Sequence, residues 1–377
     1  MSVVKFSEVA HRANTKEDRF NTDKIYYVGG EHIEPGELFI HDKGFIKGST
    51  IGPMFYCGFK SGQILFVTRN PHLRKCSVAE FDGICSEKTF VIETIDERIL
   101  LQEYLASVML SDDFWNYCEE NKSGGVNYFL NWSTLADYEF ELPSVEEQKA
   151  ISDKVWAAYR LKESYKKLLA ATEEMVKSQF IEMFGDPMLN DKQWSEYSCI
   201  SEITQIVLGS TPNSKEPSYW DGDIRWITPA EMTDQSYYIF DTVRHITDEG
   251  RKAANLTVLP EGTVLFSTRA PIGKVAIVGK EMCCNQGFKN FICSEKLNNV
   301  FLYYTLKLKK DYLCSLGTGT TFKELSKRTV ESLKIAVPPI ELQNQFETIY
   351  NQADKSGFEL RKSIDAIDAV IKSLINS

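Results

Sequence analysis

Two basic turns carry side chains that suit contacts with a polyanion. They read TRNPHLRK at residues 68–75 and TRAPIGK at residues 268–274, and each follows a strand-like apolar segment. A strand that ends in Thr-Arg and continues into a turn-forming proline projects cations from a rigid edge, where they can meet phosphate oxygens or guanine edges. The candidates are Arg69, His72, Arg74 and Lys75 in the first turn and Arg269 and Lys274 in the second. The alternative, that Arg69 and Arg269 are buried partners of carboxylates, fits the sequence equally well.

Two further loops offer small hydroxyl residues, backbone amides and cations, which are groups that bind phosphate. The candidates are Ser214, Lys215 and Arg225 in the loop at residues 209–226, and Thr320 and Lys323 in the loop at residues 317–328. The first loop also contains Trp220 and Trp226, which we interpret as core residues rather than as stacking platforms for bases. These loops extend the candidate binding surface and add no catalytic group.

The sequence contains no catalytic motif. No NPPY or DPPY tetrapeptide of an amino-methyltransferase occurs, no glycine-rich cofactor loop follows a strand, and there is no GxxxxGK[ST] phosphate loop. The Glu-x-Lys in EEQK at residues 146–149 could belong to a nuclease metal site, but it falls on the first turn of a helical pattern and is interpreted as a solvated helix start. The five histidines and nine cysteines show no zinc-ligand spacing. We therefore predict no catalytic residue, no metal site and no cofactor bound by this chain.

The net charge is unfavourable for a simple nucleic-acid binder. The 377 residues carry a formal charge of −10, with 14 basic and 22 acidic residues at 1–142 and 18 of each at 185–337. Any polyanion site must therefore be a local patch. No apolar run reaches membrane length and the N-terminus lacks a signal-peptide core, so we expect a soluble cytoplasmic protein that does not contact a membrane.

The chain is a duplicated unit. GQILFVTRNP at 62–71 matches GTVLFSTRAP at 262–271, and ELPSVEEQKAI at 141–151 matches AVPPIELQNQF at 336–346. Short apolar segments between turn residues predict β-rich globular parts, and each proline of the second phrase opens a long helical pattern. The predicted class is α+β. Its expected regions are globular domains at 1–142 and 185–337 and helical regions at 143–184 and 338–377.

Both helical regions carry apolar residues at heptad-like spacing. The residues expected to pair the helices are Ile151, Val155, Leu169 and Val176 in the first region and Phe346, Leu360, Ile364, Ile367, Ile371 and Leu374 in the second. Such a stripe needs a partner helix, so we expect an antiparallel coiled coil that separates two domains related by a pseudo-two-fold axis. The alternative is that each helix only packs on a globular domain. Trp156 and Leu161 are apolar residues that lie outside the stripe expected to pair the two helices. We therefore expect them to bind a partner.

In combination, these phrases give the sequence a strong resemblance to the specificity subunits of type I restriction-modification systems. The matching segments are the two Pro-Glu-Gln helix starts, KSQFIEMFGDP, GSTPNSKEPSYWDGDIRWITPAEM, and GTVLFSTRAPIGKVAIV with its weaker copy in the first half. The resemblance spans nearly the whole chain. It implies two target-recognition domains that each read one half of a bipartite sequence in double-stranded DNA, held apart by the helices. The first domain matches the family's characteristic sequence segments less closely than the second domain does. The two halves are therefore expected to read different DNA sequences.

The resemblance also implies partners and cofactors that the chain itself lacks. One copy would dock two modification subunits, which use S-adenosylmethionine to methylate adenine N6, and a restriction subunit would add translocation and cleavage that depend on ATP and Mg²⁺. The chain itself would be non-catalytic. Two alternatives remain: a coiled-coil scaffold without DNA binding, and a recognition subunit of a related DNA-modifying defence system without a restriction subunit.

Overall fold

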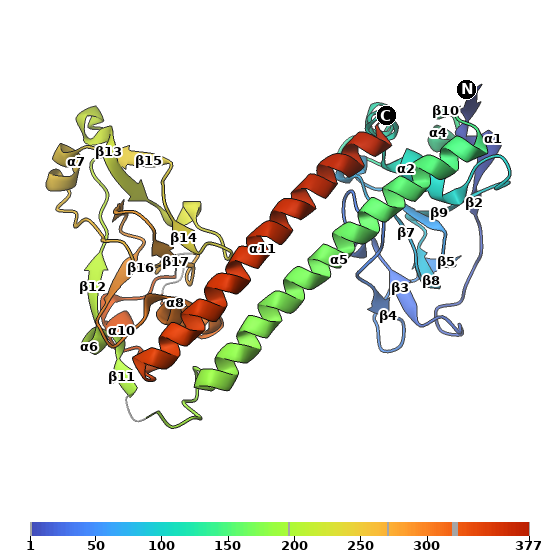
Figure 1. Cartoon of the computed structure of the whole chain (residues 1–377). Helices are drawn as coiled ribbons and strands as arrows, with labels where there is room; N and C mark the ends of the chain where they lie inside the picture. Colours follow the sequence, from blue (N-terminus) through green and yellow to red (C-terminus); the bar gives the residue numbers. More distant parts are fainter. Residues whose placement is uncertain (1, 195–196, 270, 319–322, 377) are drawn as a thin grey trace. The chain divides into compact units, whose positions relative to one another are not determined.

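A computed structural model of the chain describes residues 2–194, 197–269, 271–318 and 323–376. The chain divides into two compact units, Met1–Leu168 with Leu360–Ser377 and Leu169–Glu359. Two long helices, α5 (Val145–Phe184) and α11 (Ile340–Ile375), pass from one unit into the other (Figure 1). Each unit therefore contains a globular part and a stretch of both helices. The expected boundaries between recognition domains and helical regions stay a prediction.

Within its described residues, the first unit has two four-stranded sheets and one two-stranded sheet. The main sheet is antiparallel and has the order β2 (Ala10–Ala13), β9 (Thr89–Thr94), β6 (Ile64–Val67), β7 (Cys76–Val78). The second sheet has the order β4 (Gly44–Phe45), β3 (Tyr26–Val28), β8 (Gly83–Ser86), β5 (Phe55–Phe59), with β3 and β8 parallel. β1 (Ser2–Lys5) pairs with β10 (Glu139–Leu142). The shorter helices are α1 (Phe6–Val9), α2 (Gln102–Leu110), α3 (Asp112–Glu120) and α4 (Trp132–Ala136), with 3₁₀ turns η1 (Gly30–His32) and η2 (Pro71–Leu73).

The second unit follows with a five-stranded, a three-stranded and a two-stranded sheet among its described residues. The main sheet has the order β12 (Thr204–Leu208), β19 (Lys289–Cys293), β16 (Val264–Phe266), β17 (Val275–Val278), β14 (Tyr238–Ile239). The second sheet has the order β15 (Arg244–Ile246), β13 (Trp220–Ile227), β18 (Cys283–Cys284), with β13 and β18 parallel. β11 (Tyr197–Cys199) pairs with β20 (Lys334–Ala336). The shorter helices are α6 (Ile200–Ile203), α7 (Asp248–Ala253), α8 (Asn299–Leu308), α9 (Lys310–Ser315) and α10 (Lys327–Glu331), with 3₁₀ turns η3 (Pro217–Tyr219) and η4 (Pro229–Glu231).

Both units repeat one plan. The order β2-β9-β6-β7 corresponds to β12-β19-β16-β17, and the parallel pair β3–β8 corresponds to β13–β18. The pair β1–β10, which joins the start of the globular part to the strand before α5, corresponds to β11–β20 before α11. The α+β class with two β-rich domains and two long helices, expected from the sequence, is confirmed.

The phrase repeated in the sequence forms the central strands β6 and β16. Ile64 and Phe66 pack in the core on the helix side of the first unit, whereas Leu65 and Val67 pack in the core toward the second sheet. The second unit divides Val264–Phe266 between its two cores in the same way. Successive side chains of a strand point to opposite faces, so a strand that is covered on both faces must be apolar throughout. This explains why both copies of the phrase are unbroken apolar runs.

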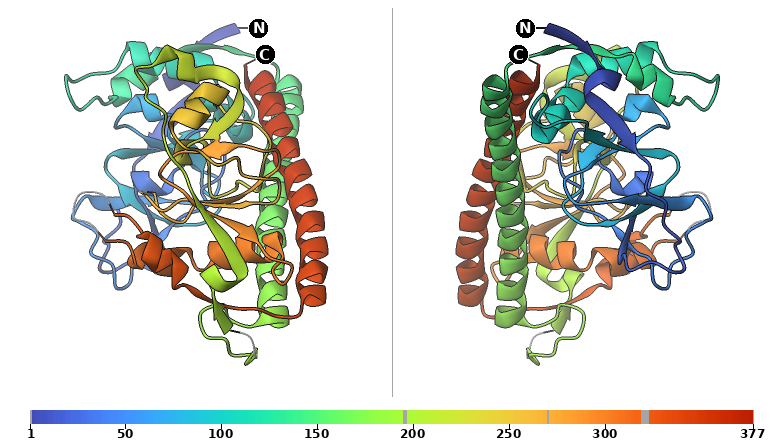
Figure 2. Two further views of the ribbon diagram at one scale, coloured as in Figure 1. Left: turned by 90° about the vertical axis from the view of Figure 1, so that its left-hand side faces the viewer. Right: turned by 90° about the vertical axis from the view of Figure 1, so that its right-hand side faces the viewer.

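The two long helices pack on the globular parts and on each other. The core of the first unit includes Val155 of α5 and Ile371 of α11, and the core of the second includes Val176 of α5 and Phe346 of α11. In the second unit the ring centroids of Phe180 and Phe346 are 5.1 Å apart. Within each unit the two stretches run antiparallel (Figure 2). The expected pairing of the two helices is therefore confirmed, and the alternative that each helix only packs on a globular domain is wrong. No helix in the described part of the chain combines the length and apolarity of a membrane span.

Candidate nucleic-acid interface

The repeated Thr-Arg segment is held by matching backbone contacts in both units. The carbonyl of Thr68 accepts a hydrogen bond from Leu130 N–H at 3.0 Å, and the carbonyl of Thr268 accepts one from Leu325 N–H at 2.9 Å. Both threonine side chains are buried, whereas the arginine after each of them is exposed. The strand and the loop beside it therefore fix the backbone of each arginine while its side chain reaches the surface.

Arg69 lies against an aromatic ring. Its backbone pairs with Phe129 in an isolated bridge, and its guanidinium carbon is 5.2 Å from the centroid of the Phe129 ring. A second bridge, from Ser123 to Phe129, closes the loop that carries this ring. In the same loop the ammonium group of Lys122 is 4.4 Å from the centroid of the Tyr128 ring. Cations and aromatic rings share this surface of the first unit, a combination that suits both phosphates and bases.

Arg269 occupies the equivalent place in the second unit with a different partner. Its backbone pairs with Glu324, and its Nε is 3.0 Å from Glu324 Oε2. The side chain of Arg269 is 48% exposed and that of Glu324 is 39% exposed. The alternative expectation for the two arginines is therefore correct in one respect and wrong in another. Arg269 does pair with a carboxylate, but neither arginine is buried. DNA contact by Arg69 and Arg269 stays a prediction.

The lysine that ends each basic turn donates to backbone carbonyls. Lys75 Nζ donates to Gly30 O at 2.5 Å, and Lys274 Nζ donates to Pro229 O and Met232 O at 3.0 and 2.5 Å. Gly30 and Pro229 begin the 3₁₀ turns η1 and η4, so each lysine ties its basic turn to the 3₁₀ turn of the same unit. This fold role leaves Lys75 and Lys274 with fewer free donors for a polyanion than the sequence suggests.

The two remaining candidates of the first turn differ in their surroundings. Arg74 adopts a left-handed φ of 49° and pairs with Asp112 at the start of α3 at 2.5 Å. Gly273 takes the same left-handed position before its lysine, with a φ of 92°. The charge of Arg74 is thus already balanced within the unit, whereas His72 is exposed on η2.

Trp220 and Trp226 are core residues, as the sequence predicts. They are 8% and 2% exposed, and their rings meet edge to face with centroids 5.2 Å apart. Their indole N–H groups donate to Asn213 O at 3.2 Å and to Ser210 O at 3.0 Å. Both rings therefore anchor the loop that precedes them, which is a reason for this loop to hold one conformation at the surface.

The remaining candidates, in the loops at residues 209–226 and 317–328, differ in solvent exposure. Ser214, Lys215 and Lys323 are exposed, and Arg225 is partly buried with its Nε 3.1 Å from Asp241 Oδ1. Thr320 lies outside the described residues. The structure does not test these five as DNA contacts, and they stay predictions.

The side chains around the two arginines were missed in the sequence. They are Phe129 in the first unit, with Lys122 and Tyr128 in the same loop, and Lys289 and Glu324 in the second unit. The basic turns repeat at an offset of 200 residues, but the loop after the short helices repeats at the offset of 195 residues seen in the helix starts. Applying that second offset pairs Phe129 with Glu324 and is the signal that would have found these two residues.

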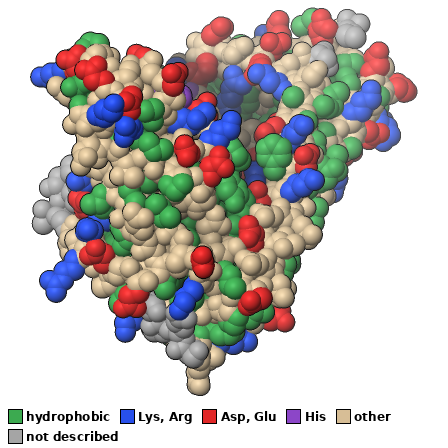
Figure 3. Space-filling view, turned by 60° about the vertical axis from the view of Figure 1, so that its left-hand side comes forward, with side chains coloured by type: hydrophobic (Ala, Val, Ile, Leu, Met, Phe, Trp, Pro, Cys, Tyr) green, Lys and Arg blue, Asp and Glu red, His purple; other side chains and the backbone are tan. Residues whose placement is uncertain are grey.

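Charge is distributed locally on the surface. On the face shown in Figure 3, Lys and Arg side chains alternate with Asp and Glu side chains. This mixture agrees with the formal charge of −10 and with the expectation that a polyanion would be met by local patches.

Comparison with known proteins shows what the chain is similar to. Residues 192–367 match the family model of the type I restriction modification DNA specificity domain. The chain is 34% identical over 189 residues to the specificity subunit of the type I restriction enzyme MjaIX from Methanocaldococcus jannaschii, an alignment that covers 49% of this chain and 44% of the relative. The second half of the chain is therefore similar to the type I restriction modification DNA specificity domain. The chain spans less than two thirds of the length of the curated relatives it first matches.

Two solved structures extend the likeness in fold to nearly the whole chain. The S subunit of a type I restriction-modification system from M. genitalium has a TM-score of 0.63 at 13% identity, covering 99% of this chain and 94% of that one. A chain from a structure on complex assembly and conformational transition of a type I R-M system has a TM-score of 0.56 at 20% identity, covering 99% and 96%. Both likenesses concern the fold.

The apolar residues expected to pair the helices are buried to different extents. Val155, Ile371, Val176 and Phe346 are core residues, and Ile151, Leu169, Leu360, Ile364, Ile367 and Leu374 are partly buried. Their role in pairing agrees with this burial and stays a prediction residue by residue.

Trp156 and Leu161, the two residues expected to bind a partner, differ in packing and exposure. The Trp156 ring packs edge to face on Phe39 with centroids 5.4 Å apart, and its N–H donates to Glu103 O at 3.2 Å. The premise that Trp156 is left over is therefore wrong, since its ring packs within the first unit. Leu161 is 45% exposed, and Leu168, one heptad later on α5, is 52% exposed. Partner binding by Trp156 and Leu161 stays a prediction.

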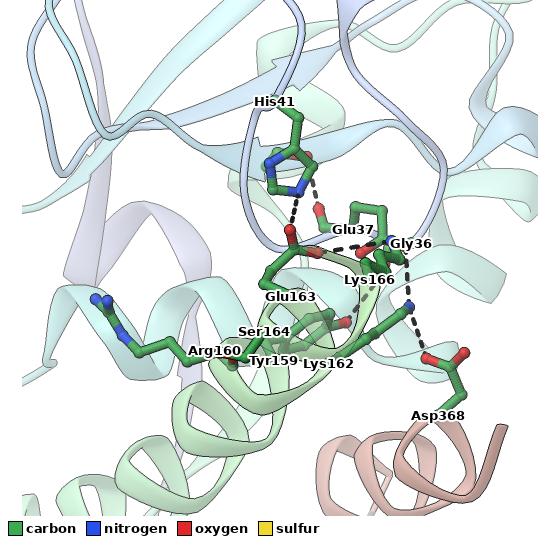
Figure 4. A network of polar contacts seen from close by, with 11 residues as sticks. Gly36, Glu37, His41, Tyr159, Arg160, Lys162, Glu163, Ser164, Lys166 and Asp368 are labelled. Atoms are coloured by element: carbon green, nitrogen blue, oxygen red, sulfur yellow. Dashed lines mark hydrogen bonds and ion pairs between the residues drawn. The ribbon is translucent and has the colours of Figure 1, made fainter. Parts of the chain in front are cut away.

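An ion-pair network joins the first globular part to both long helices (Figure 4). Glu37 Oε1 lies 2.9 Å from Lys162 Nζ and 2.9 Å from Lys166 Nζ, both on α5. Lys162 Nζ also lies 2.6 Å from Asp368 Oδ1 on α11. The Lys162 side chain is 8% exposed and that of Glu37 is 12% exposed, so the charges are largely removed from water. Such a network fixes the globular part on the helix pair.

One corner of this network has residue types that could hold a metal ion. The ligand atoms of Glu37, His41 and Glu163 lie within 4.8 Å of one another. However, Lys162 and Lys166 place two ammonium groups at the carboxylate of Glu37, and these supply the positive charge that a metal would bring. The cluster is therefore explained as part of the ion-pair network.

Proposed function

We propose that the chain is the DNA sequence-recognition subunit of a type I restriction-modification complex. Each globular part reads one half of a bipartite target in double-stranded DNA. The helices set the separation of the two halves and dock two modification subunits. One copy of the chain acts in each complex, and a restriction subunit completes the restriction activity.

The observation that carries the proposal is the duplicated arginine. A buried threonine and a matched backbone contact hold Arg69 and Arg269 at the same place in the two units, yet the side chains around them differ. An aromatic ring lies beside Arg69 and a carboxylate beside Arg269. A common frame with different surroundings is what two readers of different DNA sequences require, because direct readout depends on the side chains that reach the base edges.

Catalysis is assigned to the partners. The chain contains no amino-methylation tetrapeptide and no nucleotide-phosphate loop. S-adenosylmethionine would therefore be bound by the modification subunits, and ATP and Mg²⁺ by the restriction subunit. The methylated atom would be adenine N6, and this chain would determine only which adenines are reached.

The exposed apolar side of α5 supports the docking of a protein partner. Leu161 and Leu168 lie seven residues apart on one face of the helix, and each leaves about half of its side chain in solvent. Large exposed apolar side chains in such a row mark protein interaction surfaces. In the assembled complex this face would be covered by a modification subunit.

The test is to express the chain with the modification subunit encoded in the same genome, purify the complex and map N6-methyladenine across the genome of the expression host. We expect one bipartite motif with two specified halves and a fixed gap. A stable complex that methylates no defined motif would show a scaffold instead of a reader. Methyl transfer by the purified chain alone, after mass spectrometry has excluded a partner, would contradict the assignment of catalysis.

A further inference from the structure

A buried lysine lies behind the exposed arginine of the second unit. Lys289 begins β19, and its side chain is 7% exposed. Its Nζ lies 3.0 Å from Thr268 Oγ1 and 3.4 Å from Glu324 Oε1. The other carboxylate oxygen of Glu324 accepts the hydrogen bond from Arg269 Nε at 3.0 Å. Glu324 thus bridges a buried cation and an exposed cation.

This arrangement fixes Glu324 in two ways. Burial lowers the pKa of Lys289 below its ordinary value of 10.5, and the charge of Glu324 opposes that change. An unpaired buried ammonium group is costly, so the carboxylate of Glu324 is held at its place beside Lys289. The backbone of Glu324 is held as well, by bridges to Thr318 and Arg269.

The first unit shows that the fold does not require this pair. At the place of Lys289, β9 has Phe90, which is 6% exposed, and the place of Glu324 is taken by Phe129. The same strands and the same buried threonine before the arginine are formed without a buried charge. A buried lysine and its carboxylate are therefore present in the second unit for a reason other than forming the sheet.

Among the described residues, the contact with Glu324 occupies only part of the Arg269 guanidinium. The hydrogen bond to Glu324 uses Nε, which lies on the inner side of the group. The Nη1 and Nη2 atoms carry the remaining donors and form a planar fork, which matches the two acceptors, O6 and N7, on the major-groove edge of guanine. A phosphate contact would need the positive charge of Arg269 but no fixed orientation of its plane.

We propose that Lys289 and Glu324 are positioning residues that aim Arg269 at a guanine in the second half of the DNA target. This inference rests on the proposed function and adds the base that is read and the two residues behind the arginine. Lys289 holds Glu324, Glu324 holds Nε of Arg269, and the outer fork of Arg269 donates to one guanine. The equivalent arginine of the first unit, beside a ring instead of a carboxylate, reads its own half without this device.

The experiment uses the chain assembled with its modification subunits and compares three variants with the parent. Arg269→Lys keeps the charge and removes the fork. Lys289→Met with Glu324→Ala removes both positioning charges together, so no buried charge is left unpaired. Glu324→Asp keeps a carboxylate beside Lys289 but shortens the side chain that holds Arg269. This variant takes the place of the double variant if the double variant does not fold.

For each complex the motif is mapped by N6-methyladenine sequencing, and binding is measured on targets that differ at single base pairs. We expect all three variants to lose about 5- to 150-fold discrimination at the same G·C pair of the second half-site. Binding to DNA without the motif and the reading of the first half-site should remain as in the parent. The matched control is Lys327→Met with Glu331→Ala, an exposed pair on α10 with the same 3.4 Å separation, which should leave discrimination unchanged.

Three outcomes separate the possible failures. If the parent complex shows no bipartite motif, the proposed function is wrong and this inference falls with it. If the parent has a motif and the double variant, or Glu324→Asp in its place, keeps full discrimination, Lys289 and Glu324 do not position a reader. If Arg269→Lys, which keeps the positive charge, leaves discrimination, binding and salt dependence as in the parent, Arg269 meets a phosphate and the guanine assignment is overturned.

Discussion

At the scale of single residues, a buried glutamine explains the second repeated phrase. Gln148 and Gln343 are both 0% exposed and both lie in the first turns of a long helix. The amide of Gln343 donates to Pro338 O at 2.6 Å and to Lys296 O at 3.0 Å, and its oxygen accepts from Asn298 N–H at 2.8 Å. Gln148 makes the same three contacts in the first unit. The hydrogen bonds of Gln148 therefore hold the start of α5 against the segment before α2, and those of Gln343 hold the start of α11 against the segment before α8.

Replacing this glutamine should destabilise the second unit. In Gln343→Leu the N–H of Asn298 and two carbonyls lose their partner in a buried place, at about 1–3 kcal/mol for each group that stays unsatisfied. We expect a clear fall in the midpoint of urea unfolding, followed by fluorescence. Gln345→Leu is the matched control, because Gln345 is exposed on the same helix and its loss should change the midpoint little. Equal effects of both variants would show that the three hydrogen bonds contribute nothing specific.

A pair of thiols in the first unit predicts a pH dependence. Cys57 and Cys85 face each other across β5 and β8, and both are buried. A hydrogen bond from the Cys85 thiol lowers the pKa of Cys57 below its ordinary value, although burial opposes this change and the charge of Arg12 assists it. In contrast, burial raises the pKa of Cys118. The thiol of Cys57 therefore loses its proton more readily, because the Cys85 thiol donates a hydrogen bond that stabilises the Cys57 thiolate.

Alkylation by iodoacetamide, followed by peptide mass spectrometry, should therefore reach half of its limiting rate at Cys57 at a pH below that of an ordinary thiol. Arg12→Gln should move that midpoint upward, because it removes a positive charge that favours the thiolate. Modification of Cys57 only above pH 9, as for an ordinary thiol, would contradict the assignment.

At the scale of elements, the sequence predicts the strands and helices well because their patterns are local. The apolar runs at β6 and β16 and the heptads of α5 and α11 are each visible in a short window. The partners of the arginines are not, because Phe129 and Glu324 lie about 55–60 residues from Arg69 and Arg269, beyond loops of unequal length in the two halves. The fold role of Lys75 and Lys274 was hidden for the same reason, since their acceptors belong to distant 3₁₀ turns.

The network of Figure 4 predicts how the first unit responds to acid. Burial disfavours the charged form of Glu37, but hydrogen bonds from Lys162 and Lys166 and their charges outweigh it and leave the pKa of Glu37 below its ordinary value of 4.5. The unfolded chain therefore binds a proton at Glu37 before the folded chain does. Its contribution to stability is complete above about pH 4.5 and is lost as the pH falls through the lower folded value.

Thermal unfolding measured between pH 3 and 6 checks this prediction. Glu37→Gln should flatten the acid limb of the melting temperature, whereas Glu34→Gln, an exposed change in the same loop, should leave it as in the parent. Lys162→Met should lower the free energy of unfolding at pH 7 by about 3–5 kcal/mol, because it leaves the carboxylate of Glu37 with one of its two lysines. A Lys162→Met protein as stable as the parent would show that the network is solvated and contributes little.

At the scale of the whole molecule, the two halves keep one fold while their sequences diverge. The family match at 192–367 falls on the second half, yet the first unit repeats its strand pairing. The acidic excess is also uneven, with 14 basic and 22 acidic residues at 1–142 against 18 of each at 185–337. A fold that is retained while side chains and charge change is expected where each half meets a different DNA sequence.

Independence of the two readers is the consequence that can be tested. Because each unit has its own cores and its own arginine, exchanging residues 1–142 for the equivalent domain of a relative should change one half of the methylated motif and leave the other half as it was. The strand pair β1–β10 closes the exchanged segment at both ends, so the junction at 142 falls between β10 and α5 and cuts no sheet. Motif mapping of the chimera beside the parent gives the answer. A motif altered in both halves would show that the side chains of one domain influence the bases read by the other. In that case, the matched positions of Arg69 and Arg269 would have to be explained by the duplicated fold alone.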